Sequence, residues 1–167
     1  EIEWLVLDRE DDQLLLISKY ALDCQQYHSE WVDVTWENCD LRKWLNDTFL
    51  ERAFTSEEQM MMIAQTSVSA DRNPEHKHST YPFNDTNDKI FLLSITEAEK
   101  YFSSDEARKC ASTAYAKRQG VWTSSDFTTA GGEATCWWWL RTPGFDVSDA
   151  AGVSYDGAVS YDGLGVN

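Results

Sequence analysis

A long apolar run is the first thing this chain lacks. No stretch approaches the roughly 18 consecutive apolar residues of a membrane-spanning helix, so we expect no insertion into a membrane. A recognisable signal peptide is also missing, and the chain begins at Glu1 rather than at Met. We therefore expect an excised or processed domain, and the missing signal peptide says little about its localisation.

Positive charge is scarce as well. The 167 residues include 14 Lys and Arg against 29 Asp and Glu, which gives a formal net charge of −15. Such a field repels the phosphates of nucleic acids and the headgroups of anionic membranes, so neither is an expected partner. Proteins, glycans and cations are the partner classes that remain.

The cysteines lack the spacing of a metal or redox motif. Cys24, Cys39, Cys110 and Cys136 include no C-x-x-C pair, which argues against a zinc ribbon or a thioredoxin-like site. Two interpretations stay open for them. They form one or two disulfides if the domain is exported, or they are four buried free thiols.

Complete sets of metal ligands are missing too. His76 and His78 form an H-x-H pair with no evident third ligand, so no metal site is predicted there. The polar stretch 71–88, predicted to be a surface loop, contains the run 84–88 (N-D-T-N-D), whose oxygens are the ligands that calcium prefers. The run lacks the Gly and Glu of an EF-hand, and a solvated Asx-rich turn is the other interpretation. We predict no cofactor, with calcium at 84–88 as the alternative.

Catalytic signatures are absent from the sequence. It contains no G-x-S-x-G, no H-E-x-x-H, no P-loop and no dinucleotide-binding G-x-G-x-x-G. Its many carboxylates include accidental pairs, so a glycosidase pair is not distinguishable from surface charge without geometry. We predict no catalytic residue and a protein that is not an enzyme.

The chain does contain a series of short structural signals. Apolar or alternating runs predict strands at residues 2–7, 13–18 and 90–93. Asp40 is placed to cap a helix that runs to about Phe49, and a second helical stretch over about 105–118 ends at Gly120, a C-cap residue. No linker interrupts this pattern, so we predict one α+β domain over residues 1–167.

Three stretches together resemble a family of bacterial domains. They are residues 35–46 (TWENCDLRKWLN), 88–94 (DKIFLLS) and 138–144 (WWLRTPG), and they follow in the same order over nearly the whole chain. That family is similar to the formylglycine-generating-enzyme, or sulfatase-modifying-factor, version of the C-type lectin-like fold. The resemblance implies an α+β domain of this fold, in which Trp36, Trp44 and Arg141 belong to the scaffold.

Two departures separate the chain from the enzymes of that fold. Formylglycine-generating enzymes use a close pair of cysteines late in the chain, whereas Cys110 and Cys136 are 26 residues apart. The usual last strand, which reads like G-V-R-P-A, does not occur before Asn167. The resemblance therefore implies a fold more than a reaction.

The last 25 residues differ in composition from the rest. Residues 143–167 contain no Lys, Glu, Gln, Met or Trp and consist mainly of Asp, Ser, Tyr, Gly, Ala and Val. Randomising the adenines of Asn codons produces this set, so the segment resembles the variable region of proteins diversified by retroelements, which often have the lectin-like fold. The alternative is a Gly-rich series of β-turns, in which the repeated V-S-Y-D-G at 153–157 and 159–163 forms two hairpin turns.

This segment carries the residue types of a recognition surface. Tyr and Phe offer contact area with few rotatable bonds, and Ser and Asp offer adaptable hydrogen bonds. We therefore predict a non-catalytic domain that binds a protein or a glycan, with a cell surface or phage particle as the favoured location. The alternatives are a degenerate formylglycine-generating or carbohydrate-active enzyme and a structural domain of a larger surface or phage protein. The predicted ligand-binding residues are Phe145, Asp146, Ser148, Asp149, Ser154, Tyr155, Asp156, Ser160, Tyr161 and Asp162.

Overall fold

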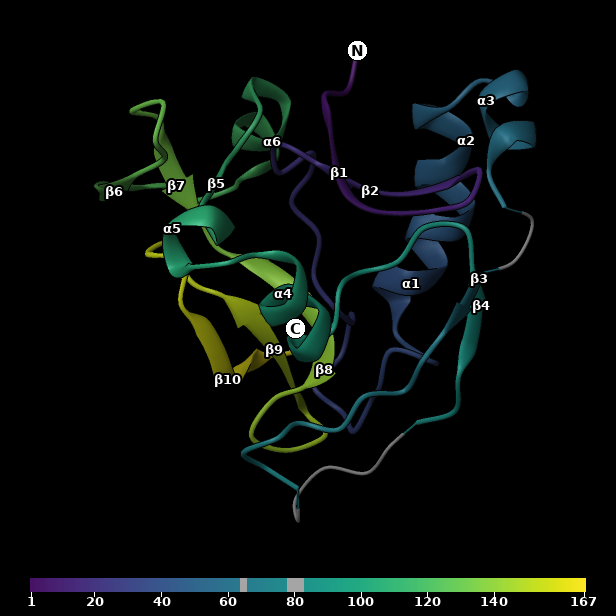
Figure 1. Ribbon diagram of the computed structural model, residues 1–167. Coiled ribbons are helices and arrows are strands. Elements are labelled where there is room, and N and C mark those ends of the chain that lie inside the picture. Colours follow the sequence, from purple (N-terminus) through teal and green to yellow (C-terminus); the bar gives the residue numbers. More distant parts are fainter. Residues whose placement is uncertain (64–65, 78–82) are drawn as a thin grey trace. The chain divides into compact units, whose positions relative to one another are not determined.

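The computed structural model describes residues 1–63, 66–77 and 83–167 (Figure 1). The fold is α+β: the described residues form short helices and four small sheets of two or three strands. They group into two compact units whose segments alternate along the chain, so the single domain over 1–167 stays a prediction. The first unit comprises residues 1–24, 96–138 and 153–159, and the second comprises 25–95, 139–152 and 160–167.

A hairpin opens the first unit. β1 (Trp4–Glu10) and β2 (Gln13–Ser18) pair antiparallel, close to the two stretches predicted as strands, and appear as the purple hairpin in Figure 1. Asp11 lies in the turn between them with a φ of 49°. An Asp tolerates this left-handed conformation better than most side chains, so the polar turn suits the hairpin.

The helical stretch predicted over 105–118 is wrong in its middle. It divides into α5 (Asp105–Arg108) and α6 (Ala114–Gln119), which are separated by β5 (Cys110–Ala111). The strand forms because β7 (Ala134–Cys136) pairs with it, and β6 (Ser124–Thr128) completes a sheet of order β5-β7-β6. The predicted C-cap is confirmed, since Gly120 ends α6 with a φ of 110°. The remaining helix, α4 (Ile95–Tyr101), begins where the first unit resumes.

The helix predicted from Asp40 is present in the second unit. α1 (Asp40–Trp44), the π-helical η1 (Leu45–Phe49) and α2 (Leu50–Ala53) follow without a break (Figure 1). Its N-cap is Cys39 rather than Asp40, because the Cys39 sulfur accepts the hydrogen bond from the Arg42 amide. α3 (Ser56–Met61) follows, capped by Thr55. No helix in the described part of the chain combines the length and apolar character needed to cross a membrane.

Residues 90–93, predicted as a strand, have no strand partner. Their backbone is hydrogen-bonded by side chains instead: Asn46 Nδ2 donates to the Ile90 carbonyl at 2.8 Å, and Arg141 donates to the Leu92 carbonyl at 2.8 Å. The Leu93 carbonyl accepts from the Arg141 amide. An apolar run of this length is compatible with either outcome, and here the long-range partners decide.

Two sheets complete the second unit. β3 (Thr66–Val68) pairs with β4 (Thr86–Asp88), so part of the stretch predicted as a loop is a strand. β8 (Trp138–Pro143), β9 (Asp149–Val153) and β10 (Val159–Gly165) form a sheet of order β10-β9-β8, and most of their residues belong to this unit. The buried core of the unit consists of Tyr27, Val34, Trp36, Cys39, Leu41, Phe83, Ala150 and Val166.

Candidate binding site

The two copies of the V-S-Y-D-G repeat have different structures. The first copy forms the turn between β9 and β10, in which Ser154 N donates to the Ala158 carbonyl and Gly157 has a φ of 89°. This confirms the first predicted hairpin turn. The second copy lies within β10, where Gly163 has a φ of 71° and donates to Ser160 Oγ, so the second predicted turn is wrong.

Close backbone contacts explain why glycine occupies the last position of both copies. A Cβ on Gly157 would lie 1.8 Å from the Asp105 carbonyl oxygen, and one on Gly163 would lie 2.0 Å from that of Ala150. Gly144 faces the Asp162 carbonyl in the same way, at 2.2 Å. Any side chain at these three positions collides with backbone, so each position admits only glycine.

None of the ten predicted binding residues is buried. Phe145 and Asp162 are exposed, and the Phe145 side chain retains 56% of its accessible surface. The structure brings Ser154, Tyr155 and Asp156 together in the first unit, and it places the other seven in the second unit. The partly exposed residues are Asp146, Ser148, Asp149, Ser154, Tyr155, Asp156, Ser160 and Tyr161.

Tyr155 belongs to a group of three aromatic rings in the first unit, which we call the Tyr155 cluster. The Trp122 ring lies 5.2 Å from it in an edge-on arrangement, and the Phe127 ring lies 6.1 Å away and nearly parallel. Trp122 is 60% exposed and Phe127 is 37% exposed. Thr135, which is fully buried, fixes the cluster by donating to the Tyr155 carbonyl at 2.7 Å. The sequence does not single out Trp122 and Phe127, because nothing local distinguishes an exposed ring from a core ring.

Phe145 belongs to a second group, the Phe145 cluster, which also includes His76 and Asp162. The His76 ring lies edge-on to Phe145 at 5.0 Å, and its Nε2 lies 2.6 Å from Asp162 Oδ1. The Asp162 side chain is 77% exposed, whereas that of His76 is 18% exposed. The sequence pattern indicates His76 only as half of an H-x-H pair, and His78 lies outside the described residues.

The Asn73 side chain forms hydrogen bonds with backbone groups at and next to the Phe145 cluster. It is fully buried, and its Nδ2 lies 2.7–3.1 Å from the carbonyl oxygens of Pro143, Gly144 and Tyr161. Its Oδ1 accepts hydrogen bonds from the amides of Glu75 and His76. One side chain thus joins the His76 segment to the end of β8 and to Tyr161 within β10.

Two carboxyl groups in the second unit have pKa values that are shifted in opposite directions. The Asp146 pKa is lowered because the Ser148 hydroxyl and amide both donate to its Oδ1. The Asp149 pKa is raised, first by partial burial and then by the negative charge of Asp146. Among the described residues, no group of three or more His, Cys, Asp or Glu side chains is arranged to hold a metal ion.

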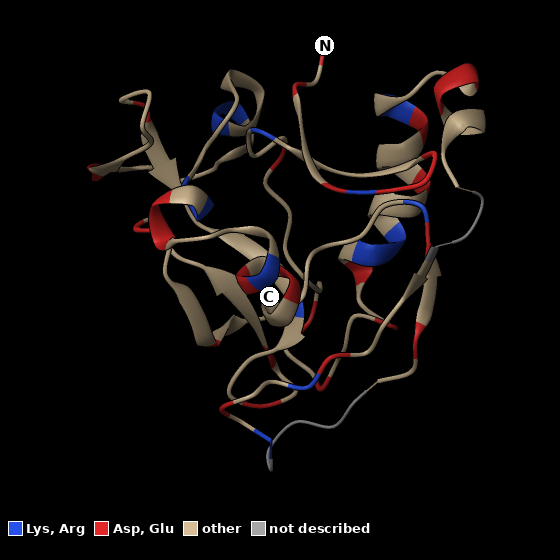
Figure 2. Ribbon diagram, in the orientation of Figure 1, with Lys and Arg blue, Asp and Glu red and all other residues tan. Residues whose placement is uncertain are grey.

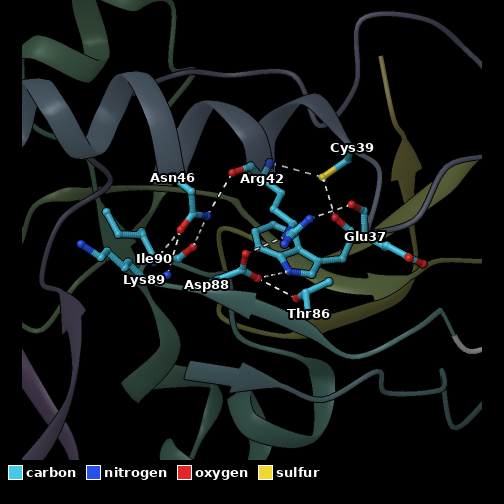
Figure 3. Close-up of polar contacts among 9 residues, drawn as sticks. Glu37, Cys39, Arg42, Asn46, Thr86, Asp88, Lys89 and Ile90 are labelled. Carbon is cyan, nitrogen blue, oxygen red and sulfur yellow. Dashed lines mark hydrogen bonds and ion pairs between the residues drawn. The ribbon is translucent and has the colours of Figure 1, made fainter. Parts of the chain in front are cut away.

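Asp88 is the last residue of the oxygen-rich run 84–88, and its carboxylate is buried and hydrogen-bonded to other side chains (Figure 3). Its Oδ1 accepts from Arg42 Nε at 2.7 Å, and its Oδ2 accepts from Trp36 Nε1 and Thr86 Oγ1. The Asp88 side chain is 2% exposed, so this network anchors α1 and buries Trp36. Calcium at 84–88 stays a prediction, and the Asp88 carboxylate already accepts three hydrogen bonds from side chains of the protein.

Arg141 has the scaffold role expected for it. It is fully buried and donates to the carbonyl oxygens of Ser69 and Leu92, with Asp71 at 4.0 Å. Tyr27 Oη donates in turn to the Arg141 carbonyl. Lys and Arg positions are few, and half of them lie on helices such as α1, α2 and α6, while Asp and Glu positions occur along both units (Figure 2).

The family model for a domain of unknown function, DUF6273, matches residues 11–166. The chain is a member of the DUF6273 family. The match spans the Tyr155 cluster, the Phe145 cluster and the Asp88 network, so all three belong to the DUF6273 domain. Neither a search of curated proteins nor a search of solved structures found a match to the chain.

Proposed function

We propose that this DUF6273 domain is a non-catalytic binding module that recognises a protein or a glycan through residues 143–167. The Tyr155 cluster in the first unit and the Phe145 cluster in the second unit are each a candidate contact surface by itself. The supporting observation is the contrast between side chains and backbone in residues 143–167. The side chains of Phe145, Tyr155 and Asp162 are exposed or partly exposed. Buried side chains hold the backbone at or next to them: Thr135 donates to the Tyr155 carbonyl, and Asn73 donates to the carbonyls of Gly144 and Tyr161. A surface held in place before binding loses less conformational entropy on binding.

We also propose that the domain has the C-type lectin-like fold of the formylglycine-generating-enzyme type. The support is the ordered set of motifs at 35–46, 88–94 and 138–144, whose residues Trp36, Asp88 and Arg141 all lie in the buried scaffold. An experimental structure tests this proposal. A strand order or connectivity unlike that of the lectin-like fold would rule it out.

Diversification by a retroelement is the third part of the proposal. Packing explains the small residues of β9, since Ala150, Ala151 and Val153 are buried, but it does not explain the exposed positions of the segment. The encoding locus from sibling isolates tests the idea. We expect codon changes at Phe145, Tyr155, Tyr161 and Asp162, matched to adenines of a nearby template copy, and constant codons at Gly157 and Gly163. A constant segment without a template copy contradicts it.

Binding is tested with the labelled protein on a glycan array and on intact bacterial cells, with and without protease treatment. We expect saturable binding that falls at least tenfold in Tyr155→Ser or Phe145→Ser. Tyr115→Ser and Trp31→Ser are the matched controls, because these rings are 47% and 71% exposed and lie outside residues 143–167. Protease-sensitive binding identifies a protein ligand, and binding on the array identifies a glycan. Unchanged binding by both Tyr155→Ser and Phe145→Ser would exclude both clusters as binding surfaces.

A further inference from the structure

Two of the four cysteines lie directly opposite each other in the first unit. β5 and β7 pair antiparallel, with Cys110 opposite Cys136 and Ala111 opposite Thr135. Directly opposed residues of an antiparallel pair have Cα atoms about 4.5–5.5 Å apart and side chains on the same face, and a disulfide spans Cα distances of about 4.4–6.8 Å. The two sulfurs can therefore be joined without moving the strands.

Neighbouring hydrogen bonds fix this register. The Ala21 amide donates to the Ala111 carbonyl at 2.9 Å, and the Thr113 amide donates to the Ala21 carbonyl at 3.0 Å, so β5 is held on its other edge. On β7, the Thr135 hydroxyl donates to the Tyr155 carbonyl. A slip of one strand by one residue would place the two cysteines on opposite faces of the sheet and would break these bonds.

The two thiols differ in burial and in the direction of their pKa shifts. A hydrogen bond from the Cys136 thiol lowers the pKa of Cys110, whereas that same bond and then burial raise the pKa of Cys136. Cys136 is 1% exposed, and its thiol also lies 3.4 Å from the Cys110 carbonyl oxygen, while Cys110 is only partly buried. Since the thiolate is the nucleophile, Cys110 reacts first and Cys136 second.

The other two cysteines provide internal comparisons. Cys24 is exposed, and desolvation raises its pKa. Cys39 is fully buried at the start of α1, where burial raises its pKa to about 11. Neither is paired with a cysteine across a sheet in the described strand registers, so neither is expected to form an intramolecular bridge.

We propose that Cys110 and Cys136 are a redox modification site that closes a reversible intramolecular disulfide by exchange with a small-molecule disulfide such as oxidised glutathione. The Cys110 thiolate attacks one sulfur of that disulfide and releases one glutathione thiolate. The Cys136 sulfur then attacks Cys110 Sγ in the mixed disulfide, releases the second glutathione, and passes its proton to it. The two cysteines are oxidised together, and one glutathione disulfide is reduced to two thiols.

The bridge would close a loop that contains α6 and β6. This loop carries Trp122 and Phe127, and Thr135 beside Cys136 holds the Tyr155 carbonyl. The oxidised protein is therefore expected to unfold at a temperature higher by roughly 10 °C, because the crosslink restricts the unfolded chain. This proposal does not depend on the binding function proposed above, and its test measures no ligand.

The test equilibrates the full chain in mixtures of reduced and oxidised glutathione, followed by acid quenching, alkylation and peptide mapping. We expect a linked Cys110–Cys136 peptide, loss of two hydrogen atoms from the intact mass, and reversal by dithiothreitol. Oxidation in denaturant is the control for specificity, because it should give bridges that also involve Cys24 and Cys39. Free Cys110 and Cys136 in the native protein under excess oxidised glutathione would overturn the proposal.

Variants separate the two roles. Cys136→Ala should trap a glutathione adduct on Cys110, whereas Cys110→Ser should leave Cys136 without an adduct because Cys136 is buried. Cys24→Ser is the matched control, and it should form the bridge as the unaltered chain does. An adduct on Cys24 alone in every form would contradict the assignment.

Discussion

Replacing Asn73 by Ala tests whether its buried hydrogen bonds stabilise the backbone next to the Phe145 cluster. The Asn73 Nδ2 has two hydrogens, which serve three carbonyl oxygens, those of Pro143, Gly144 and Tyr161. Asn73 is fully buried, so water does not replace the lost donor at Pro143 and Gly144. A buried polar group left without a partner costs about 1–3 kcal/mol. Two lost bonds therefore predict a decrease of about 3–4 kcal/mol in the free energy of unfolding.

A loss of this size is large relative to the roughly 5–15 kcal/mol that stabilises a typical domain. Urea unfolding followed by circular dichroism measures it directly. Asn87→Ala is the matched control, because Asn87 is exposed and its replacement should change the free energy of unfolding by less than about 0.5 kcal/mol. A loss below about 1 kcal/mol in Asn73→Ala would refute the argument that this side chain holds the end of β8 against Tyr161 of β10.

Asn73→Asp distinguishes the lost donor from the lost volume. The Asp side chain has the same shape and keeps the Oδ1 acceptor for Glu75 and His76, but an ionised carboxylate faces the three carbonyl oxygens. We expect a loss at pH 7 at least as large as that of Asn73→Ala. The loss should shrink on acidification, because a protonated carboxyl donates one hydrogen bond.

Three further substitutions test other parts of the structure. Gly163→Ala should lower the free energy of unfolding by more than about 2 kcal/mol, because of the positive φ and the contact with the Ala150 carbonyl, whereas Gly131→Ala, with its nearest contact at 3.6 Å, should cost less than about 1 kcal/mol in the same urea assay. Asp88→Ala leaves buried partners unpaired and should cost about 3–5 kcal/mol by thermal or urea unfolding. Asp149→Asn should stabilise the protein by less than about 1 kcal/mol at pH 7, and a pH series should show no gain below about pH 4. The raised pKa of Asp149 means that its ionisation opposes folding, so the stability it contributes when protonated is lost as the pH rises through the folded-state pKa. A gain that persists in acid would contradict this cause.

Local signals predicted part of the fold correctly. The alternating strands near 2–7 and 13–18, the helix that starts at Asp40, the Gly120 cap and the turn at Asp156 and Gly157 are all present. Each depends on backbone preferences and contacts within a few residues. The one-residue error at the Cys39 cap has the same origin, since a sulfur acceptor is rare there and Asp is common.

The errors arise where distant residues compete with local preference. Residues 90–93 form no strand, and Asn46 and Arg141 bind the carbonyl groups of Ile90 and Leu92 instead. The second V-S-Y-D-G copy has the same letters as the first, but Gly163 lies against Ala150 of β9 and stays within β10. Identical local sequences therefore adopt different structures because their spatial neighbours differ.

The sequence by itself determined the α+β class, the acidic surface charge and the segment whose composition suggests recognition. Only the tertiary structure decided which side chains surround that segment. Asn73 and Tyr161 are 88 residues apart, and Cys110 and Cys136 are 26 residues apart, yet each pair is in contact. Composition and periodicity act over a few residues, whereas strand pairing and burial join distant ones, so the clusters, their buried support and the opposed cysteines appear only in the folded chain.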